Sequence, residues 1–131
     1  MVISEASILV VEDNIQTRKL VEYWLSRHFT ITVAANAEEA LALVEWQHFD
    51  LFLLDIHLGG GLTGLELLTV LRRSPAYAHT PAIAFTAYAL THERDHLMAS
   101  GFDIFLCKPF TEQEIVSAIN KGLSLGYSLC S

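Results

Sequence analysis

The sequence has few cysteines, few basic residues and no long apolar run, and each shortage excludes a class of protein. Its two cysteines, Cys107 and Cys130, form neither a metal-binding spacing nor a redox motif, so we expect a reduced protein in the cytoplasm. Eight basic residues stand against 15 acidic ones, and the net charge of −7 disfavours binding of nucleic acid or of an anionic membrane through this chain. No apolar run approaches the ~18 residues of a membrane span, and no basic signal-peptide region opens the sequence.

What the sequence does contain is a regular alternation of apolar runs and amphipathic stretches. Of its 131 residues, 52% are hydrophobic, which is enough for one domain with a well-filled core. The apolar runs predict five strands, at 7–11, 29–35, 50–54, 82–86 and 103–107. The stretches between and after them predict five helices, at 14–27, after Asn36, at 64–73, at 88–99 and at about 112–122. Capping pairs mark three of the helix starts: Asn36 with Glu39, Thr63 with Glu66, and Thr111 with Glu114.

This alternation predicts the architecture. Strands this apolar, separated by helices, are typical of a parallel sheet that is covered on both faces. We therefore expect an α/β domain over residues 1–122, built as a single doubly wound sheet of five parallel strands with helices on both faces. A C-terminal tail is expected at 123–131, and no internal repeat or second domain is recognisable.

Polar residues stand at the carboxyl ends of four of the five predicted strands. Glu12 and Asp13 follow the first strand, Asp55 follows the third, Thr86 ends the fourth and Lys108 follows the fifth. One such residue alone usually only meets solvent, but the carboxyl ends of parallel strands share one edge, where open sheets bind ligands. Three converging carboxylates favour a hard divalent cation such as Mg²⁺. With a lysine and a hydroxyl opposite them, the pattern predicts a site that places a phosphoryl group on or beside a carboxylate.

Four segments, ILVVEDN, FDLFLLD, TPAIAFTA and GFDIFLCKPF, resemble in order and spacing the receiver domain of two-component response regulators. The resemblance covers about residues 5–122. It implies a flavodoxin-like sheet with the strand order 2-1-3-4-5, which sets the first strand beside the third. It also implies that Asp55 accepts a phosphoryl group from a histidine kinase or a histidine phosphotransfer protein. The protein would then be a signalling switch, not an enzyme that turns over an external substrate.

The resemblance also assigns the metal ligands. Asp13 and Asp55 would ligate Mg²⁺, and Glu12 would act on the ion mainly through water. The backbone carbonyl of His57 would complete the coordination. The side chain of His57 either covers part of the site or faces the solvent, and the sequence does not decide between these positions.

The remaining expected site residues belong to the switch. Thr86 would donate a hydrogen bond to one phosphoryl oxygen, and Lys108 would pair with another. Phe105 corresponds to an aromatic residue whose rotamer is coupled to that hydroxyl. Phosphorylation would thereby change a partner-binding face made of the fourth helix, the fifth strand and the fifth helix. The Lys108–Pro109 peptide bond is the candidate for a cis bond.

The loop after Asp55 departs from the pattern of the family. Gly59 stands where a proline is common, and the glycine expected eight residues after the aspartate is most naturally Gly64, nine residues after it. The loop is therefore one residue longer, with glycines at 59–61 adding backbone freedom. We expect a mobile or bulged loop beside the site.

A zinc hydrolase is a remote alternative. The segment HERDH, 92–96, matches the H-E-x-x-H pattern, in which His92 and His96 bind zinc and Glu93 is the general base. No clear third ligand follows, since only Glu112 or Glu114 could serve. We therefore favour a solvated helix surface that forms part of the partner-binding face.

Other modules explain the same strand ends less well. A flavin- or nucleotide-binding module would need a glycine- or serine-rich loop after the first strand, where this chain has Glu12, Asp13 and Asn14, which repel phosphate. An aspartyl-phosphate phosphatase usually carries D-x-D, and His57 takes the place of the second acid. A receiver-fold interaction module that works without phosphorylation uses the same residues and remains an alternative.

Overall fold

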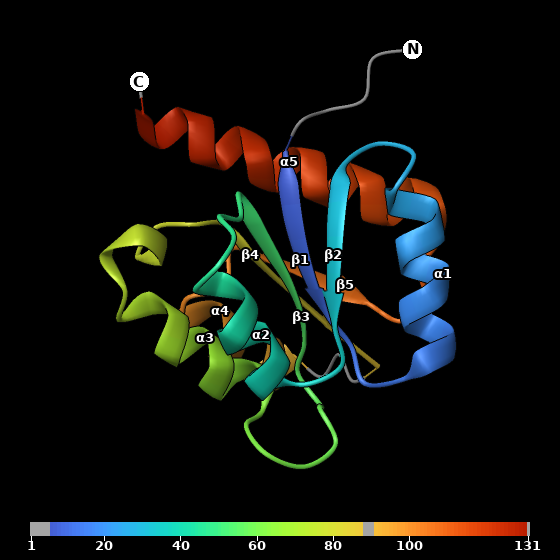
Figure 1. The fold of residues 1–131 in the computed structure, drawn as a ribbon, viewed down its shortest axis with the longest axis horizontal. Helices are drawn as coiled ribbons and strands as arrows, with labels where there is room; N and C mark the ends of the chain where they lie inside the picture. Colours follow the sequence, from blue (N-terminus) through green and yellow to red (C-terminus); the bar gives the residue numbers. More distant parts are fainter. Residues whose placement is uncertain (1–5, 88–90, 131) are drawn as a thin grey trace.

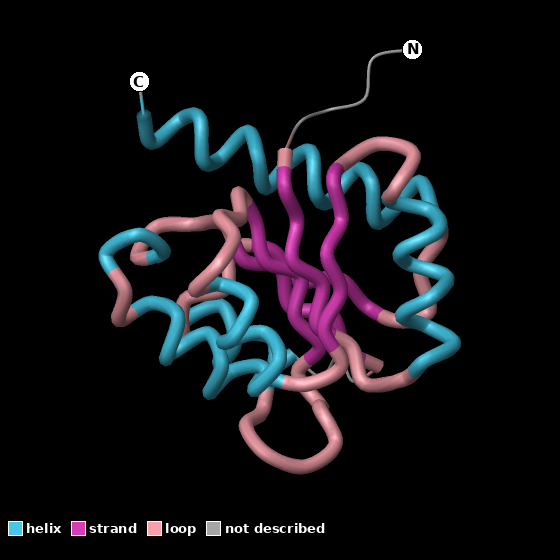
Figure 2. The backbone as a smooth tube through the Cα atoms, in the orientation of Figure 1, coloured by secondary structure: helices cyan, strands magenta, loops and turns pink. Residues whose placement is uncertain are grey.

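Parallel strands form a sheet at the centre of the molecule, and helices cover both of its faces (Figure 1; Figure 2). The computed structural model describes residues 6–87 and 91–130, with the side chains of all of these except 91–94 and 126–130. The strands are β1 (Ser7–Val11), β2 (Thr30–Ala34), β3 (Leu51–Asp55), β4 (Ala82–Thr86) and β5 (Ile104–Cys107). The helices are α1 (Ile15–Leu25), α2 (Ala37–Val44), α3 (Gly64–Arg72), α4 (Thr91–Ala99) and α5 (Glu112–Cys130), with a short 3-10 helix η1 (Pro75–Tyr77).

The strand order is β2-β1-β3-β4-β5, and every pair of neighbours is parallel, so the predicted fold and strand order are confirmed. The register of the central pair positions the site. Val11 of β1 lies opposite Leu54 of β3. The next residue in each segment, Glu12 after Val11 and Asp55 after Leu54, therefore lies at the carboxyl edge of the sheet, and the two are side by side.

The sheet has a separate apolar core on each face, because side chains alternate along a strand. On one face, Ile8, Val10 and the strand residues in line with them pack against α1 and α5. On the other face, Leu9, Val11 and their neighbours pack against α2, α3 and α4. Figure 1 shows these two helix layers on opposite sides of the sheet. All five residues of β3 are buried, which explains why its sequence is an unbroken apolar run that ends in Asp55.

The predicted helix starts are largely confirmed. Two capping boxes have hydrogen bonds in both directions, Thr63–Glu66 and Thr111–Glu114. At the third start, the side chain of Asn36 accepts a hydrogen bond from the backbone N–H of Glu39. The carboxylate of Glu39 accepts from the N–H of Ala35 instead of from that of Asn36, so this cap reaches one residue further back.

The C-terminal helix is longer than the sequence pattern predicts. We expected it to end at about residue 122, and this is wrong, because α5 continues to Cys130. Leu123 packs against the α1 and α5 side of the core. Gly122 is buried within the helix, and a Cβ added there would lie 2.7 Å from the side chain of Leu51, so this glycine lets α5 pass close to β3. Residues 123–130 are therefore the last turns of α5.

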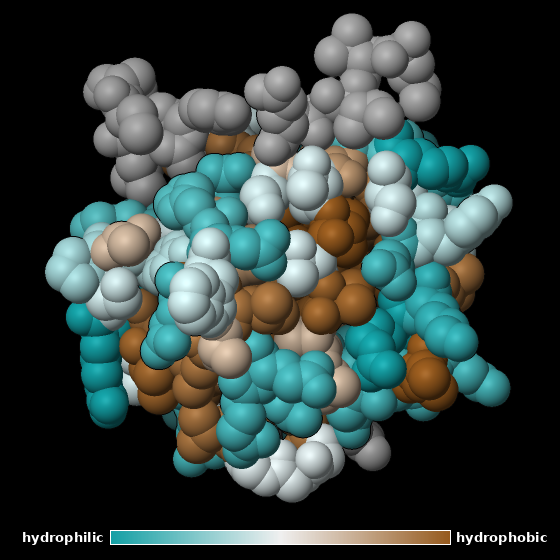
Figure 3. Space-filling view, viewed as in Figure 1, coloured by the Kyte–Doolittle hydropathy of each residue, from teal (hydrophilic) through white to brown (hydrophobic). Residues whose placement is uncertain are grey.

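The described part of the predicted fourth helix begins at Thr91, and residues 88–90 of that prediction lie outside the described residues. On the face drawn in Figure 3, polar residues cover most of the surface and apolar residues form patches between them. Within residues 6–87 and 91–130, no helix combines the length and the apolar composition needed to cross a bilayer.

Candidate functional site

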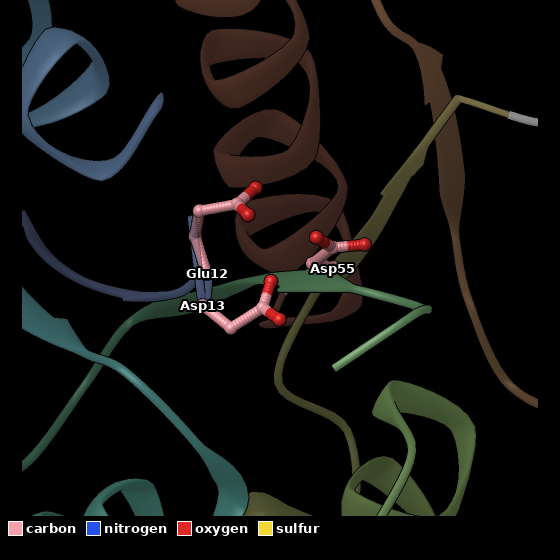
Figure 4. Close-up of side chains that lie close together, drawn as sticks. All are labelled: Glu12, Asp13 and Asp55. Carbon is pink, nitrogen blue, oxygen red and sulfur yellow. The ribbon is translucent and has the colours of Figure 1, made fainter. Parts of the chain in front are cut away.

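Three carboxylates from two neighbouring strands meet at the carboxyl edge of the sheet (Figure 4). Glu12 and Asp13 directly follow β1, and Asp55 is the last residue of β3. One carboxylate oxygen from each residue lies within 4.8 Å of the other two. The sheet topology therefore brings the adjacent residues Glu12 and Asp13 together with Asp55, which follows them by more than 40 positions in the sequence.

The side chain of Lys108, which follows the edge strand β5, extends into this acidic group. Nζ of Lys108 lies 2.7 Å from Oε2 of Glu12 and 3.0 Å from Oδ2 of Asp55. The ring of Phe85 lies below the ammonium, with its centroid 4.9 Å away. The Lys108–Pro109 peptide bond is cis. The ammonium group of Lys108 therefore contacts two of the three carboxylates.

Burial shifts the pKa of Glu12 and of Lys108. Glu12 is fully buried and Asp55 is 3% exposed, whereas Asp13 is exposed. Burial raises the pKa of Glu12 from 4.5 to about 7; hydrogen bonds from Lys108 and from the N–H of Asn14 lower it, and the charge of Asp55 raises it. For Lys108, burial lowers the pKa, but the hydrogen bonds to Glu12 and Asp55 outweigh burial and raise it above its ordinary value. The lysine is therefore a fixed positive charge.

Hydrogen bonds fix the carboxylate of Asp55 and the strand ends around it. The N–H of His57 donates to Oδ1 of Asp55 at 3.0 Å, while Oδ2 of the same carboxylate accepts from Lys108. The N–H of Lys108 donates to the carbonyl of Thr86 at 2.9 Å, which ties the ends of β4 and β5 together. Both carboxylate oxygens of Asp55 are thus oriented by the protein itself. The side chain of His57 is exposed.

Thr86 and Phe105, the two expected switch residues, lie on adjacent strands. Thr86 is the last residue of β4 and is fully buried. Phe105 lies on β5 opposite Ala84, two residues before the Thr86–Cys107 pair. Its ring is half-buried and packs against the core on the α2, α3 and α4 side. A buried hydroxyl and a half-buried ring therefore lie near each other, on strands that end at the acidic group.

The loop from β3 to α3 projects beyond the edge of the sheet, where Figure 1 draws it in green below the strands. The expectation of a mobile or bulged loop here remains a prediction. Gly64 lies close against the end of β3, because a Cβ added there would lie 2.2 Å from the backbone oxygen of Asp55. Within the loop, the N–H of Gly59 donates to Oδ2 of Asp13 at 2.9 Å. The loop therefore contacts the carboxylate of Asp13 through Gly59, and α3 begins against the backbone of Asp55 at Gly64.

A hard divalent cation fits these donors. Mg²⁺ prefers a small number of carboxylate oxygens and keeps several water ligands. Asp55 offers a buried carboxylate and Asp13 an exposed one, so protein and water can both reach an ion at this position. Among the residues that the structure describes, Glu12, Asp13 and Asp55 form the one group of three or more side chains suited to holding a metal.

The zinc alternative gains no support. The side chains of His92 and Glu93 lie outside the described residues, and His96 is exposed on α4. Both acids considered as a third ligand have other partners. Glu112 pairs with Arg27 and lies 3.6 Å from His28, while Glu114 completes the capping box of α5.

Sequence reasoning missed two contributors to the site, Phe85 and Gly59. The apolar run of β4 predicts that Phe85 is buried but gives no sign that its ring lies below a charged lysine. Gly59 stood out only as part of a glycine-rich loop. No short-range pattern predicts its contact with Asp13, which lies 46 residues away in the sequence.

Comparison with known proteins agrees with this geometry. The pattern of the response regulator receiver domain matches residues 8–120. A relative from Leptolyngbya boryana, named as an uncharacterized 14.6 kDa protein in the sodA1 3′ region, is 36% identical over 120 residues, which is 91% of each chain. Three other relatives, named as transcriptional regulators or regulatory proteins, are longer, and the chain spans 50%, 46% and 53% of their lengths.

Solved structures show the same fold. Chemotaxis protein CheY4 of Vibrio cholerae is 26% identical, with a TM-score of 0.84 over 90% of this chain and 98% of that one. The receiver domain of the sensor histidine kinase PA1611 of Pseudomonas aeruginosa is 29% identical, with a TM-score of 0.82 over 92% and 99% of the two chains. In that structure a magnesium ion is coordinated in the active site cleft.

Proposed function

The chain belongs to the response regulator receiver domain family, and from this we propose that it is a phosphorylation-dependent signalling switch with Asp55 as its phosphoryl acceptor. One observation carries the proposal. The buried carboxylate of Asp55 lies at the end of β3, with the ammonium of Lys108 at 3.0 Å and the carboxylates of Glu12 and Asp13 beside it. An acceptor, a fixed cation and a group of metal-ligating oxygens therefore meet at one point.

The phosphoryl donor would be a phosphohistidine on a histidine kinase or on a histidine phosphotransfer protein. An oxygen of Asp55 forms the new P–O bond as the P–N bond breaks, and the histidine nitrogen of the partner keeps the electron pair. Phosphoryl transfer needs positioning and charge neutralisation more than covalent chemistry by the protein. The hydrogen bonds from His57 and Lys108 supply the positioning, because each holds one oxygen of Asp55.

Mg²⁺ held by Asp13 and Asp55, with Glu12 acting through water and the carbonyl of His57 as a further ligand, would neutralise the charge that builds up on the phosphoryl oxygens. Lys108 would pair with one phosphoryl oxygen, and the hydroxyl of Thr86 would donate to another. The same residues would assist loss of the phosphoryl group to water. The protein would therefore catalyse changes to its own modification and turn over no external substrate.

The added charge would then bias a surface between two states. Movement of Thr86 toward the phosphoryl group would open space for the ring of Phe105 to turn inward. Because Phe105 lies on β5, this rotation would change the face formed by α4, β5 and α5, which we propose as the binding surface for a downstream protein.

Mapping the phosphorylated residue tests this function. The protein is incubated with acetyl phosphate and Mg²⁺ and then reduced with borohydride, which converts an aspartyl phosphate to homoserine. Peptide mapping is expected to find homoserine at position 55. Modification at other aspartates with none at Asp55 would contradict the proposal. An interaction module that works without phosphorylation would give no homoserine at any position.

A further inference from the structure

The loop between β3 and α3 is attached to the carboxylate of Asp13 through a single residue, Gly59. The backbone N–H of Gly59 donates a hydrogen bond of 2.9 Å to Oδ2 of Asp13. Asp13 follows a central strand and is exposed, so its carboxylate has more conformational freedom than the buried carboxylate of Asp55. A fixed N–H donor restricts that freedom.

A side chain at this position would displace the carboxylate of Asp13. A Cβ added to Gly59 would lie 2.9 Å from Oδ2 of Asp13, a distance that real Cβ atoms essentially never show. The backbone of Gly59 is not in the left-handed region, so its conformation does not itself require glycine. Gly60, by contrast, has a φ of +75° and open space around the position of a Cβ. The two neighbouring glycines therefore serve different needs, room beside Asp13 at one position and a turn at the other.

We propose that Gly59 is a positioning residue for the metal ligand Asp13. Its N–H holds Oδ2, and its missing side chain leaves that oxygen in place, so the carboxylate is oriented toward Asp55 before an ion arrives. A carboxylate has two oxygens, and one can accept from the loop while the other faces a cation. The inference rests on the proposed function, in which Asp13 ligates Mg²⁺.

Hydrogen bonds that orient a metal ligand measurably strengthen metal binding. Loss of such a partner typically weakens metal binding about 10- to 100-fold. Because the donor here is a backbone N–H, only proline removes it without shortening the loop. Alanine at the same position keeps the N–H but places its Cβ against the carboxylate.

The experiment measures Mg²⁺ affinity by calorimetry for the wild type, Gly59→Pro, Gly59→Ala and the loop control Gly60→Ala. We expect Gly59→Pro to raise the Kd for Mg²⁺ about tenfold and Gly59→Ala to raise it less. Gly60→Ala strains the same loop without touching Asp13, so it should lower thermal stability while changing the Kd by less than about twofold. Equal weakening by Gly60→Ala and Gly59→Pro would overturn the inference, because loop conformation would then explain both.

A Kd for Gly59→Pro that equals that of the wild type, or is tighter, also overturns the inference while leaving the proposed function intact. Absence of Mg²⁺ binding by the folded wild type contradicts the proposed metal site itself, and the inference with it. A second measurement does not depend on the folding of a loop variant. Hydrogen exchange of the Gly59 amide in the wild type should be slow and should accelerate about tenfold or more in Asp13→Ala. Unchanged exchange means that the hydrogen bond does not persist and overturns the proposal.

Discussion

Nζ of Lys108 lies 3.0 Å from Oδ2 of Asp55, although Asp55 ends β3 and Lys108 follows β5, and these two strands are not neighbours in the sheet. The end of β4 lies between them and contributes Thr86, whose carbonyl accepts the backbone N–H of Lys108. The lysine also contacts the buried Glu12. Its ammonium group is therefore the main positive charge that the described residues place on the acidic group.

Removing this charge should destabilise the protein. Lys108→Met leaves Glu12 and Asp55 buried without their ammonium partner, and losing one partner of a buried ion pair is costly. The lysine is partly solvent-accessible, so we expect a loss of about 1–3 kcal/mol in the free energy of unfolding without Mg²⁺. Urea denaturation measures it. Lys121→Met, which removes an exposed lysine of α5, is the control and should change stability by less than about 0.5 kcal/mol. Equal effects of the two substitutions would contradict the account.

The raised pKa of Glu12 predicts that the free energy of unfolding depends on pH. Its pKa is about 7 in the folded protein, against an ordinary value of 4.5. The folded state therefore holds this proton more tightly than the unfolded chain does. The corresponding stability is fully present below pH 4.5 and is lost as the pH rises through about 7. Without Mg²⁺, the wild type should lose more free energy of unfolding than Glu12→Gln across this window. Urea denaturation at several pH values measures the difference, and parallel curves for the two proteins would show that Glu12 does not titrate there.

Phe105→Ala should leave phosphorylation of Asp55 intact and abolish the conformational change that follows it. The ring lies on β5, away from the acidic group, so acceptance of a phosphoryl group on Asp55 should continue. The switch proposal requires the ring to move, and the spectral changes that phosphorylation causes along α4, β5 and α5 should therefore be lost. Amide NMR spectra before and after treatment with acetyl phosphate measure them. A variant that still shows the full wild-type changes on this face would remove Phe105 from the switch.

Gly64→Ala should damage both the fold and the site. A Cβ at this position would lie 2.2 Å from the backbone oxygen of Asp55, so either α3 or the end of β3 must move. We expect a loss of at least about 2 kcal/mol in the free energy of unfolding together with weaker Mg²⁺ binding. Gly60→Ala is the matched control, because its Cβ meets no neighbour and only its positive φ is strained. Denaturation and calorimetry measure the two effects. A Gly64→Ala protein as stable as Gly60→Ala would show that the close approach is not maintained in solution.

Much of this fold could be predicted from the sequence because the central strands β1, β3 and β4 are almost entirely buried. Runs such as LFLL before Asp55 are continuous for that reason, and their order along the chain reproduces the observed elements. The end of α5 could not be predicted. Gly122 permits close packing on Leu51 there, and packing between distant elements is not visible in a local pattern.

The acidic group was also predictable, because the carboxyl ends of parallel strands must share one edge. The pairing of Lys108 with both Glu12 and Asp55 was not, since it depends on side-chain conformations across three strands. The contact between Gly59 and Asp13 depends on the path of a loop that a sequence pattern does not specify. The cytoplasmic location remains a prediction.

Intact-mass spectrometry tests the central claim most directly. Wild type, Asp55→Asn and wild type with EDTA are incubated with acetyl phosphate and Mg²⁺, and circular dichroism confirms that each is folded. The account predicts a single phosphoryl adduct on the wild type that is absent both from Asp55→Asn and from the EDTA sample. A folded wild-type protein that binds Mg²⁺ but gains no adduct, or an adduct that persists in Asp55→Asn, would contradict the assignment of Asp55 as the phosphoryl acceptor.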